Sequence, residues 1–261
     1  MASSPPPGAE AVWKREAAEV FRAEREIYES EREAQFFFRT QIAIVKRMLA
    51  GVRGRLLAIG CAAGGEIPPL RAMGFDLVGI DLIGEMLAPA RRRFAGDPGV
   101  SFCQADIEKL PFAAESFDAV VCLGVFEYVP SYEPSLVEIH RVLRPGGRAL
   151  ISLPSRVSAY ETGIRVAQPL LRWAKKLAGR ATAAAPPQFR NLCDPPRLRE
   201  LARAHGLAPK DDAFTAFLIY PLDRLSPALF DSVARTLEPL SSVPGLRTAA
   251  SQYLLSVEKS S

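Results

Sequence analysis

Three carboxylates each follow an apolar run, and carboxylates in such places can bind a ligand or move a proton. Asp81 ends the run Val78-Gly-Ile-Asp81, Asp106 follows the apolar run around Phe102, and Glu127 comes shortly after the run that ends at Leu123. The carboxyl ends of parallel strands meet at one edge of a sheet, and ligands bind outside that edge. A carboxylate there accepts hydrogen bonds from hydroxyl or amino groups, or acts as a general base. The spacing therefore predicts a ligand site at one sheet edge.

A turn of small residues precedes these carboxylates, in Arg55-Leu-Leu-Ala-Ile-Gly-Cys-Ala-Ala-Gly-Gly65. The apolar run ends at Gly60, and Glu66-Ile-Pro-Pro-Leu70 then opens a predicted helix, since Pro is tolerated in a first helical turn. Small side chains let the backbone approach a ligand, and the free N–H groups of the helix point at it. Alanines at positions 62 and 63 break the G-x-G-x-x-G pattern, which disfavours a pyrophosphate ligand.

The position of Asp81 favours an adenosine group as the ligand. It follows Gly60 by about 20 residues, the separation at which an acid meets both ribose hydroxyls. Asp106 is suited to accept from an adenine amino group while the backbone N–H of Ile107 serves a ring nitrogen. By itself, Asp106 is equally suited to cap the turn that follows it.

Alternating strand and helix signals must position these groups. A helix with a basic end is predicted at 84–94, where Arg side chains favour the negative end of the helix dipole. Strands separated by helices imply right-handed crossovers and a parallel sheet. The predicted strands are 55–60, 74–81, 99–104, 116–123 and 147–153.

Composition limits the class of protein. With 261 residues, 48% hydrophobic and 24% charged, the chain suits one large α/β domain with additions. Its net charge of +4 is spread along the chain, so no nucleic-acid partner is implied. No apolar run approaches the roughly 20 residues of a membrane span. The four cysteines lack CxxC spacing, which predicts reduced core thiols in a cytoplasmic protein and no metal site.

Segments outside the strand-and-helix run are assigned as additions. Residues 1–9 are predicted to be a disordered tail and 10–50 an N-terminal helical cap. The cap either covers an exposed sheet face or closes over the ligand cleft, with Tyr28, Phe37 or Arg39 reaching inward. Residues 51–261 form the ligand-binding domain, with a lid insertion at about 155–191. Part of that insertion is an amphipathic basic helix, for which packing on the core is favoured over membrane-surface contact.

Several of these stretches together resemble one family. They are Leu57-Ala-Ile-Gly-Cys-Ala-Ala-Gly64, Val78-Gly-Ile-Asp81, Ala105-Asp-Ile-Glu-Lys-Leu-Pro-Phe112, Ser116-Phe-Asp-Ala-Val-Val-Cys122 and Glu138-Ile-His-Arg-Val-Leu-Arg-Pro-Gly-Gly147. In this order they resemble the core of class I S-adenosylmethionine-dependent methyltransferases, small-molecule type, similar to ubiquinone and menaquinone C-methyltransferases. The resemblance implies an α/β, Rossmann-like three-layer sandwich with a seven-stranded, mostly parallel sheet and an antiparallel last strand.

The resemblance also implies a cofactor, S-adenosyl-L-methionine, and the positions that would bind it. Those positions are Gly60, Cys61, Ala62, Asp81, Leu82, Asp106, Ile107 and Leu123. Two departures stand out, because the family usually has an acid at the position of Ala58 and a second glycine at that of Ala62. The missing carboxylate removes a group that would orient either the cofactor's amino end or the glycine loop. Either another residue substitutes for it, or the methionine portion of the cofactor sits differently.

A sulfonium methyl group is already activated, so the protein mainly positions reactants, excludes water and, for O- or N-acceptors, supplies a base. The catalytic candidates are Tyr28, Tyr160, Asn191 and Glu127. For a tyrosine, packing with its hydroxyl in water is the ordinary alternative.

Three functions are compatible with the sequence. The first is methyl transfer to a small-molecule acceptor in specialised or quinone-type metabolism. The second is a cyclase or lyase in which the cofactor's own amine expels methylthioadenosine, as in azetidine formation, because one fold supports several chemistries. The third is a non-catalytic protein that binds the cofactor.

Overall fold

A single seven-stranded sheet forms the centre of the molecule, with strand order β3-β2-β1-β4-β5-β7-β6. The computed structural model describes residues 34–166, 191–217 and 227–260. The strands are β1 (Arg55–Ile59), β2 (Asp76–Asp81), β3 (Val100–Gln104), β4 (Phe117–Cys122), β5 (Leu143–Pro154), β6 (Leu207–Thr215) and β7 (Gln252–Lys259).

Pairing within the sheet is parallel from β3 through β5. The last strand, β7, runs antiparallel to both β5 and β6. The predicted α/β sheet with an antiparallel last strand is therefore confirmed. The chain order reverses between β1 and β4, and in open α/β sheets ligands bind at such a switch point.

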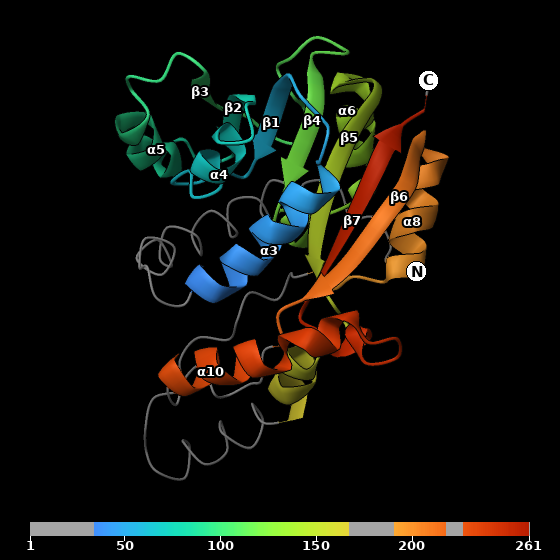
Figure 1. Cartoon of the computed structure of the whole chain (residues 1–261). Coiled ribbons are helices and arrows are strands. Elements are labelled where there is room, and N and C mark those ends of the chain that lie inside the picture. Colours follow the sequence, from blue (N-terminus) through green and yellow to red (C-terminus); the bar gives the residue numbers. More distant parts are fainter. Residues whose placement is uncertain (1–33, 167–190, 218–226, 261) are drawn as a thin grey trace, which may run out of the picture.

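Helices cover both faces of the sheet and complete three layers (Figure 1). One face carries α3 (Ala34–Met48), α4 (Ile67–Arg71) and the pair η1 (Gly84–Leu87) and α5 (Ala88–Arg93); the other carries α6 (Tyr132–Val142) and α8 (Pro195–Ala204). Each face has its own apolar cluster. The cluster under α3 and α4 includes Val45 and Ile67, and the cluster under α6 and α8 includes Ile139 and Leu198. Burial of these side chains, at roughly 25 cal/mol per Å² of apolar surface, holds the layers together.

The fifth strand begins earlier than position 147, where the sequence pattern placed its start. Leu143 already pairs with Phe117, and a register shift separates that pair from the pairing of Ala119 with Arg148. The Pro-Gly-Gly segment has the composition of a turn, but it is held as a bulge in the strand because pairing with β4 continues on both sides of it. The second strand begins at Asp76 and not at Gly74, whose φ of +89° is incompatible with a strand.

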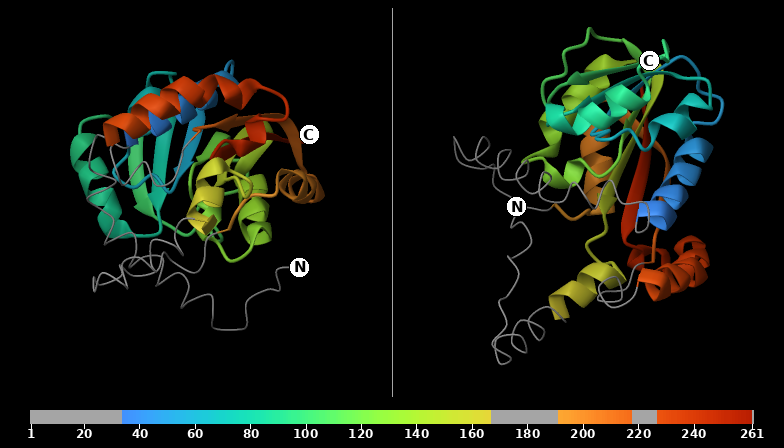
Figure 2. Two further views of the ribbon diagram at one scale, coloured as in Figure 1. Left: turned by 90° about the horizontal axis from the view of Figure 1, so that it is seen from below. Right: turned by 90° about the vertical axis from the view of Figure 1, so that its left-hand side faces the viewer.

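Additional helices follow the carboxyl ends of the parallel strands, and those at 159–166 and 227–249 lie at the lower end of the molecule in Figure 1 and in the right-hand view of Figure 2. They are η2 (Phe126–Tyr128), a short helix at 159–166, α10 (Pro227–Leu237), η3 (Glu238–Ser242) and η4 (Arg247–Ala249). These helices therefore lie on the side of the sheet where the parallel strands have their carboxyl ends, which is where the ligand site was predicted.

Some predicted segments fall wholly or partly outside the described residues. These include the tail at 1–9, the part of the cap that contains Tyr28, and much of the lid insertion. Across the described ranges, no helix has the length and apolarity that a bilayer crossing requires. All four cysteines are free thiols, with Cys61, Cys122 and Cys193 buried.

Candidate functional site

The turn after β1 is bound tightly to the neighbouring strand β2. The backbone N–H groups of Gly60 and Cys61 both donate to the carbonyl of Ile80, at 2.8 and 3.0 Å. Gly60 has φ +71°, and a Cβ on it would lie 2.2 Å from Cγ2 of Val125. Only glycine combines that backbone conformation with such a close approach.

Ala62 adopts the left-handed conformation, with φ +42°. For a residue with a Cβ this conformation costs roughly 1–2 kcal/mol. Its N–H donates to Oδ2 of Asp81 at 3.0 Å. The alanine therefore holds, under strain, a backbone conformation that glycine adopts readily.

Asp81, at the end of β2, uses both carboxylate oxygens. Oδ2 accepts from Ala62, and Oδ1 accepts from the N–H of Ile83 at 2.9 Å. Burial raises the pKa of this carboxyl group, while the two N–H groups act in the opposite direction. Each carboxylate oxygen has a second lone pair, so the group can still accept from two hydroxyls of a diol.

The loop after Asp81 is held by β3. The side-chain amide of Gln104 donates to the carbonyl of Leu82 at 2.9 Å. Leu82 itself is 40% exposed, which leaves an apolar side chain at the surface beside Asp81.

Asp106 follows β3 and organises a local turn. Its Oδ1 accepts from the N–H of Glu108 at 3.0 Å, and its carbonyl accepts from Lys109 at 3.0 Å. Of the two roles expected for this side chain, turn capping is therefore visible; recognition of adenine remains a prediction. Ile107 is buried beside it.

The loop that contains Asp106 is anchored by α6, through two residues far along the chain. Glu138 accepts from the N–H of Leu110 at 2.6 Å. Arg141 donates to the carbonyls of Leu110 and Phe112, at 2.9 and 2.6 Å, and its guanidinium pairs with Glu138. The stretches 105–112 and 138–147, which look independent in the sequence, are thus one structural unit.

Two catalytic candidates meet after β4. Glu127 is 5% exposed, and its Oε1 lies 3.6 Å from where a Cβ on Gly124 would be, close to the half-buried Leu123. The N–H of Asn191 donates to the carbonyl of Glu127 at 2.8 Å. The Asn191 side chain donates to the carbonyl of Val129 at 2.6 Å, so its amide holds the η2 backbone. Tyr160 is half-buried in the helix at 159–166, whereas Tyr28 lies outside the described residues.

The helix α3 covers a face of the sheet, the first of the two roles that the sequence left open; closure over the ligand cleft remains a prediction. Its residues Val45 and Met48, and Leu49 directly after it, are buried against the sheet. Toward the other end, the ring of Phe38 comes within 3.5 Å of the position of a Cβ on Gly65. One helix therefore covers the sheet face and touches the glycine turn. Arg39 is exposed, and Phe37 lies in the same helix.

Two further candidates for the site were not singled out in the sequence. Glu66 was treated only as the start of a helix; it is half-buried, and burial together with the negative charge of Asp81 raises its pKa to about 8. Gln252, at the start of β7, is 6% exposed, and its Oε1 has no hydrogen-bond partner among the described residues. The available signals were an acid directly after the glycine turn and a polar residue opening a buried strand.

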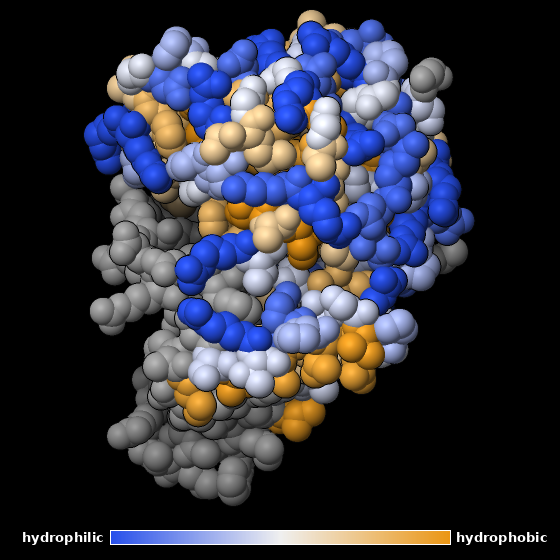
Figure 3. All heavy atoms as spheres, in the orientation of Figure 1, coloured by the Kyte–Doolittle hydropathy of each residue, from blue (hydrophilic) through white to orange (hydrophobic). Residues whose placement is uncertain are grey.

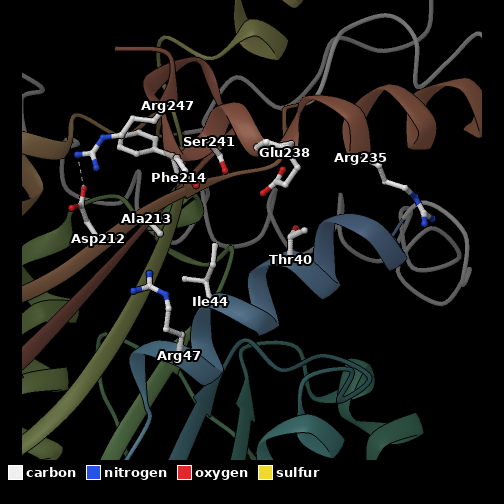
Figure 4. A pocket seen from close by; sticks show the side chains of 12 residues that line it. Thr40, Ile44, Arg47, Asp212, Ala213, Phe214, Arg235, Glu238, Ser241 and Arg247 are labelled. Carbon is white, nitrogen blue, oxygen red and sulfur yellow. Dashed lines mark hydrogen bonds and ion pairs between the residues drawn. The ribbon is translucent and has the colours of Figure 1, made fainter. Parts of the chain in front are cut away.

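A separate pocket of about 670 Å³ lies between α3, β6 and η3 (Figure 4). Its arginines have partners: Arg47 pairs with Asp211 at 2.6 Å and Arg247 with Asp212 at 3.4 Å. In Figure 3 hydrophilic side chains flank the hollow between α3 and α10. None of the predicted site residues that the structure describes lines this pocket, which lies beside the edge strand β6, away from β2 and β3.

The donor set of the crevice fits S-adenosylmethionine. Asp81 suits the ribose diol, Asp106 and Ile107 suit the adenine edge, and the glycine turn admits the methionine portion beside Leu123. Within the described ranges no group of His, Cys, Asp and Glu could hold a metal ion.

Comparison with known proteins agrees with this geometry. Residues 57–151 match the family model described as "Methyltransferase domain". A malonyl-[acyl-carrier protein] O-methyltransferase from Enterobacter lignolyticus is 37% identical over 109 residues, 42% of this chain and 42% of the relative. A demethylmenaquinone methyltransferase from Clavibacter sepedonicus is 41% identical over 106 residues, 40% of this chain and 43% of the relative. The matches thus span less than half the length of these curated relatives.

A solved structure supports the fold over a longer span. The Burkholderia thailandensis 1,6-didemethyltoxoflavin-N1-methyltransferase, with bound 1,6-didemethyltoxoflavin and S-adenosylhomocysteine, superimposes with a TM-score of 0.60. The identity is 17%, and the superposition covers 98% of this chain and 91% of that one. A likeness at this identity concerns the fold. The segment that matches the methyltransferase family model, residues 57–151, contains the glycine turn and both strand-end aspartates, and the chain shares the fold of this solved methyltransferase.

Proposed function

We propose that this protein transfers the methyl group of S-adenosylmethionine to a small organic acceptor. One observation carries the proposal: Asp81 and Asp106 stand at adjacent strand ends beside a glycine turn, and polar groups stand past Leu123. This arrangement separates a nucleoside-binding half from a half that can take a second molecule.

In the nucleoside-binding half, the backbone of Gly60, Cys61 and Ala62 would lie along the methionine portion of the cofactor. Asp81 would hold the ribose, with Leu82 at the rim, and Asp106 with Ile107 would hold the adenine. The bound cofactor supplies a methyl group already activated by its sulfonium. The residues supply orientation and exclusion of water, which account for much of the rate enhancement in such reactions.

In the acceptor half, Glu127 is the group placed to take a proton from an O- or N-acceptor. Asn191 acts through it, because it holds the backbone of η2 on which Glu127 stands. The Oε1 atom of Gln252 can receive a hydrogen bond from a hydroxyl or amino group of the acceptor. Tyr160 and Tyr28 complete the proposed catalytic set.

The relatives suggest which acceptors to test first. One is named for malonyl-[acyl-carrier protein] and the other for demethylmenaquinone, so carboxylated thioesters and quinone precursors come before other small molecules. We further propose that the acceptor belongs to specialised metabolism. The free thiols favour the cytoplasm as the site of action, and no nucleic-acid partner is needed.

A second reaction is favoured by one observation, the carboxyl of Glu66 with its pKa of about 8 beside the glycine turn. Such a group can accept a proton from the cofactor's ammonium. The free amine would then attack the side-chain carbon of the methionine portion that is bonded to sulfur. The C–N bond forms as the C–S bond breaks, and methylthioadenosine leaves.

One experiment separates these reactions. The purified protein is incubated with S-adenosylmethionine alone and with each acceptor, and products are followed by mass spectrometry. S-adenosylhomocysteine together with a methylated acceptor, formed only when acceptor is present, supports methyl transfer. Methylthioadenosine formed without acceptor supports the cyclisation. Cofactor binding without any product across the acceptor panel would identify a binding protein and overturn both enzymatic proposals.

A further inference from the structure

Position 58, where the resemblance leads us to expect an acid, holds an alanine in this chain. Ala58 is fully buried in the apolar cluster that also contains Cys61 and Ile67. The methionine portion of S-adenosylmethionine ends in an ammonium group, and a cation that leaves water needs an acceptor or a counter-charge. Another residue near the turn must therefore meet it.

We infer that Glu66 is the carboxylate that holds the ammonium group of the cofactor, in place of the acid absent at position 58. The inference rests on the proposed function, because it names a contact of the same cofactor site. It assigns to Glu66 a positioning role at the methionine end and no part in the recognition of adenine or ribose.

The backbone brings Glu66 back toward the crevice. The N–H of Gly64 donates to the carbonyl of Cys61 at 2.7 Å, and that of Ile67 donates to the carbonyl of Gly64 at 3.2 Å. Gly64 has φ +77°, so the chain reverses within the turn. As a result Glu66 lies within electrostatic reach of Cys61, before the turn, and of Asp81, at the end of β2.

Among the residues that the structure describes, the surroundings of Glu66 hold negative charge and no cation paired with it. Asp81 is the charged neighbour, and Cys61 is a buried thiol whose pKa is raised by burial. From α3, the apolar ring of Phe38 faces the turn at Gly65. The basic residue of α4, Arg71, is paired with Asp97 and Asp76. Among the described residues, none forms an ion pair with Glu66.

Two acids near one turn without a cation make a favourable place for a cationic ligand. In the free protein, burial and Asp81 keep much of the Glu66 carboxyl protonated at neutral pH, since its pKa is about 8. A bound ammonium favours the ionised form. Binding below about pH 8 must therefore release a proton, and affinity must rise as the pH increases toward that value.

The test compares two ligands that differ at the methionine end. Binding of S-adenosylmethionine and of methylthioadenosine, which lacks the ammonium and carboxylate, is measured by calorimetry for the native protein, Glu66→Gln and Glu200→Gln. Glu200 is an exposed acid on α8 and serves as the matched control. We expect Glu66→Gln to weaken S-adenosylmethionine binding by roughly 10- to 100-fold. Its affinity for methylthioadenosine should stay within about twofold of that of the native protein.

A second readout follows the proton. Calorimetry in buffers of different ionisation enthalpy, at about pH 7, is expected to show proton release on S-adenosylmethionine binding by the native protein and less release by Glu66→Gln. If Glu66→Gln fails to fold, Glu66→Asp keeps the charge on a shorter side chain and is expected to show weaker binding with the proton release retained.

The inference would be overturned if Glu66→Gln bound both ligands more weakly by the same factor, or if it bound both as tightly as the native protein does. Failure of the proposed function has a different signature: the native protein binds S-adenosylmethionine with the Glu66 dependence described, but no acceptor is methylated. If the native protein does not bind S-adenosylmethionine at all, both the inference on Glu66 and the proposed function are wrong.

Discussion

The side chain of Asp81 and the backbone N–H of Ala62 share a hydrogen bond of 3.0 Å. This contact joins the end of β2 to the turn after β1, so the group proposed to hold the ribose also holds the turn proposed to lie along the methionine portion. The two halves of the nucleoside site are therefore mechanically coupled.

Replacement of Asp81 by alanine is expected to weaken cofactor binding by about 1–3 kcal/mol, because it removes an acceptor for the diol and the anchor of Ala62. Calorimetric titration with S-adenosylmethionine measures the loss. Asp76→Asn is a suitable control, since Asp76 is an exposed acid at the other end of the same strand. Equal affinities of Asp81→Ala and the native protein would remove Asp81 from the site.

Ala62→Gly is expected to raise the free energy of unfolding by about 1 kcal/mol, because glycine adopts the left-handed conformation without strain. Its N–H is retained, so cofactor affinity should stay the same. Chemical denaturation measures the change. Ala63→Gly, at a neighbouring residue without positive φ, should lower stability instead. A less stable Ala62→Gly protein would show that the alanine conformation is not strained.

Glu138→Gln is expected to loosen the loop at 105–112 and to weaken binding of the adenosine portion. The pKa of Glu138 is lowered, mainly by its hydrogen bond with Arg141. A lowered carboxyl pKa contributes stability that is present above the unfolded pKa and is lost as the pH falls through the folded value. Unfolding of the native protein and the variant, compared from about pH 6 to pH 3, should therefore differ at the upper end and converge in acid. A constant difference across that range would contradict the assignment.

Gln252→Leu is expected to leave thermal stability unchanged or slightly higher, because a buried acceptor without a partner is removed, and to reduce turnover of the acceptor. Ser135, on α6, is the matched control, since its Oγ is likewise buried without a partner among the described residues. Ser135→Ala should likewise leave the thermal unfolding temperature unchanged or slightly higher, and it should keep the turnover of the native protein. Unchanged turnover in Gln252→Leu would exclude Gln252 from the acceptor half.

Local patterns in the sequence were sufficient to predict the five parallel strands of the sheet. The strands that end near Gly60, Asp81 and Leu123 are short apolar runs bounded by turn residues, and these signals depend on neighbours in the chain. The positions of Asp81 and Asp106 at strand ends followed from the same runs. The antiparallel last strand came from the resemblance alone.

Contacts between distant segments decided the rest. β5 starts at Leu143 because β4 pairs with it, and the amide of Asn191 is engaged by Val129, far away in the chain. The importance of Glu66 depends on burial and on the field of Asp81, and neither can be calculated from neighbouring residues. Periodicity and turn chemistry, which are local, thus placed the strands and their terminal acids, whereas tertiary packing determined which of the polar groups are buried, charged or already bonded.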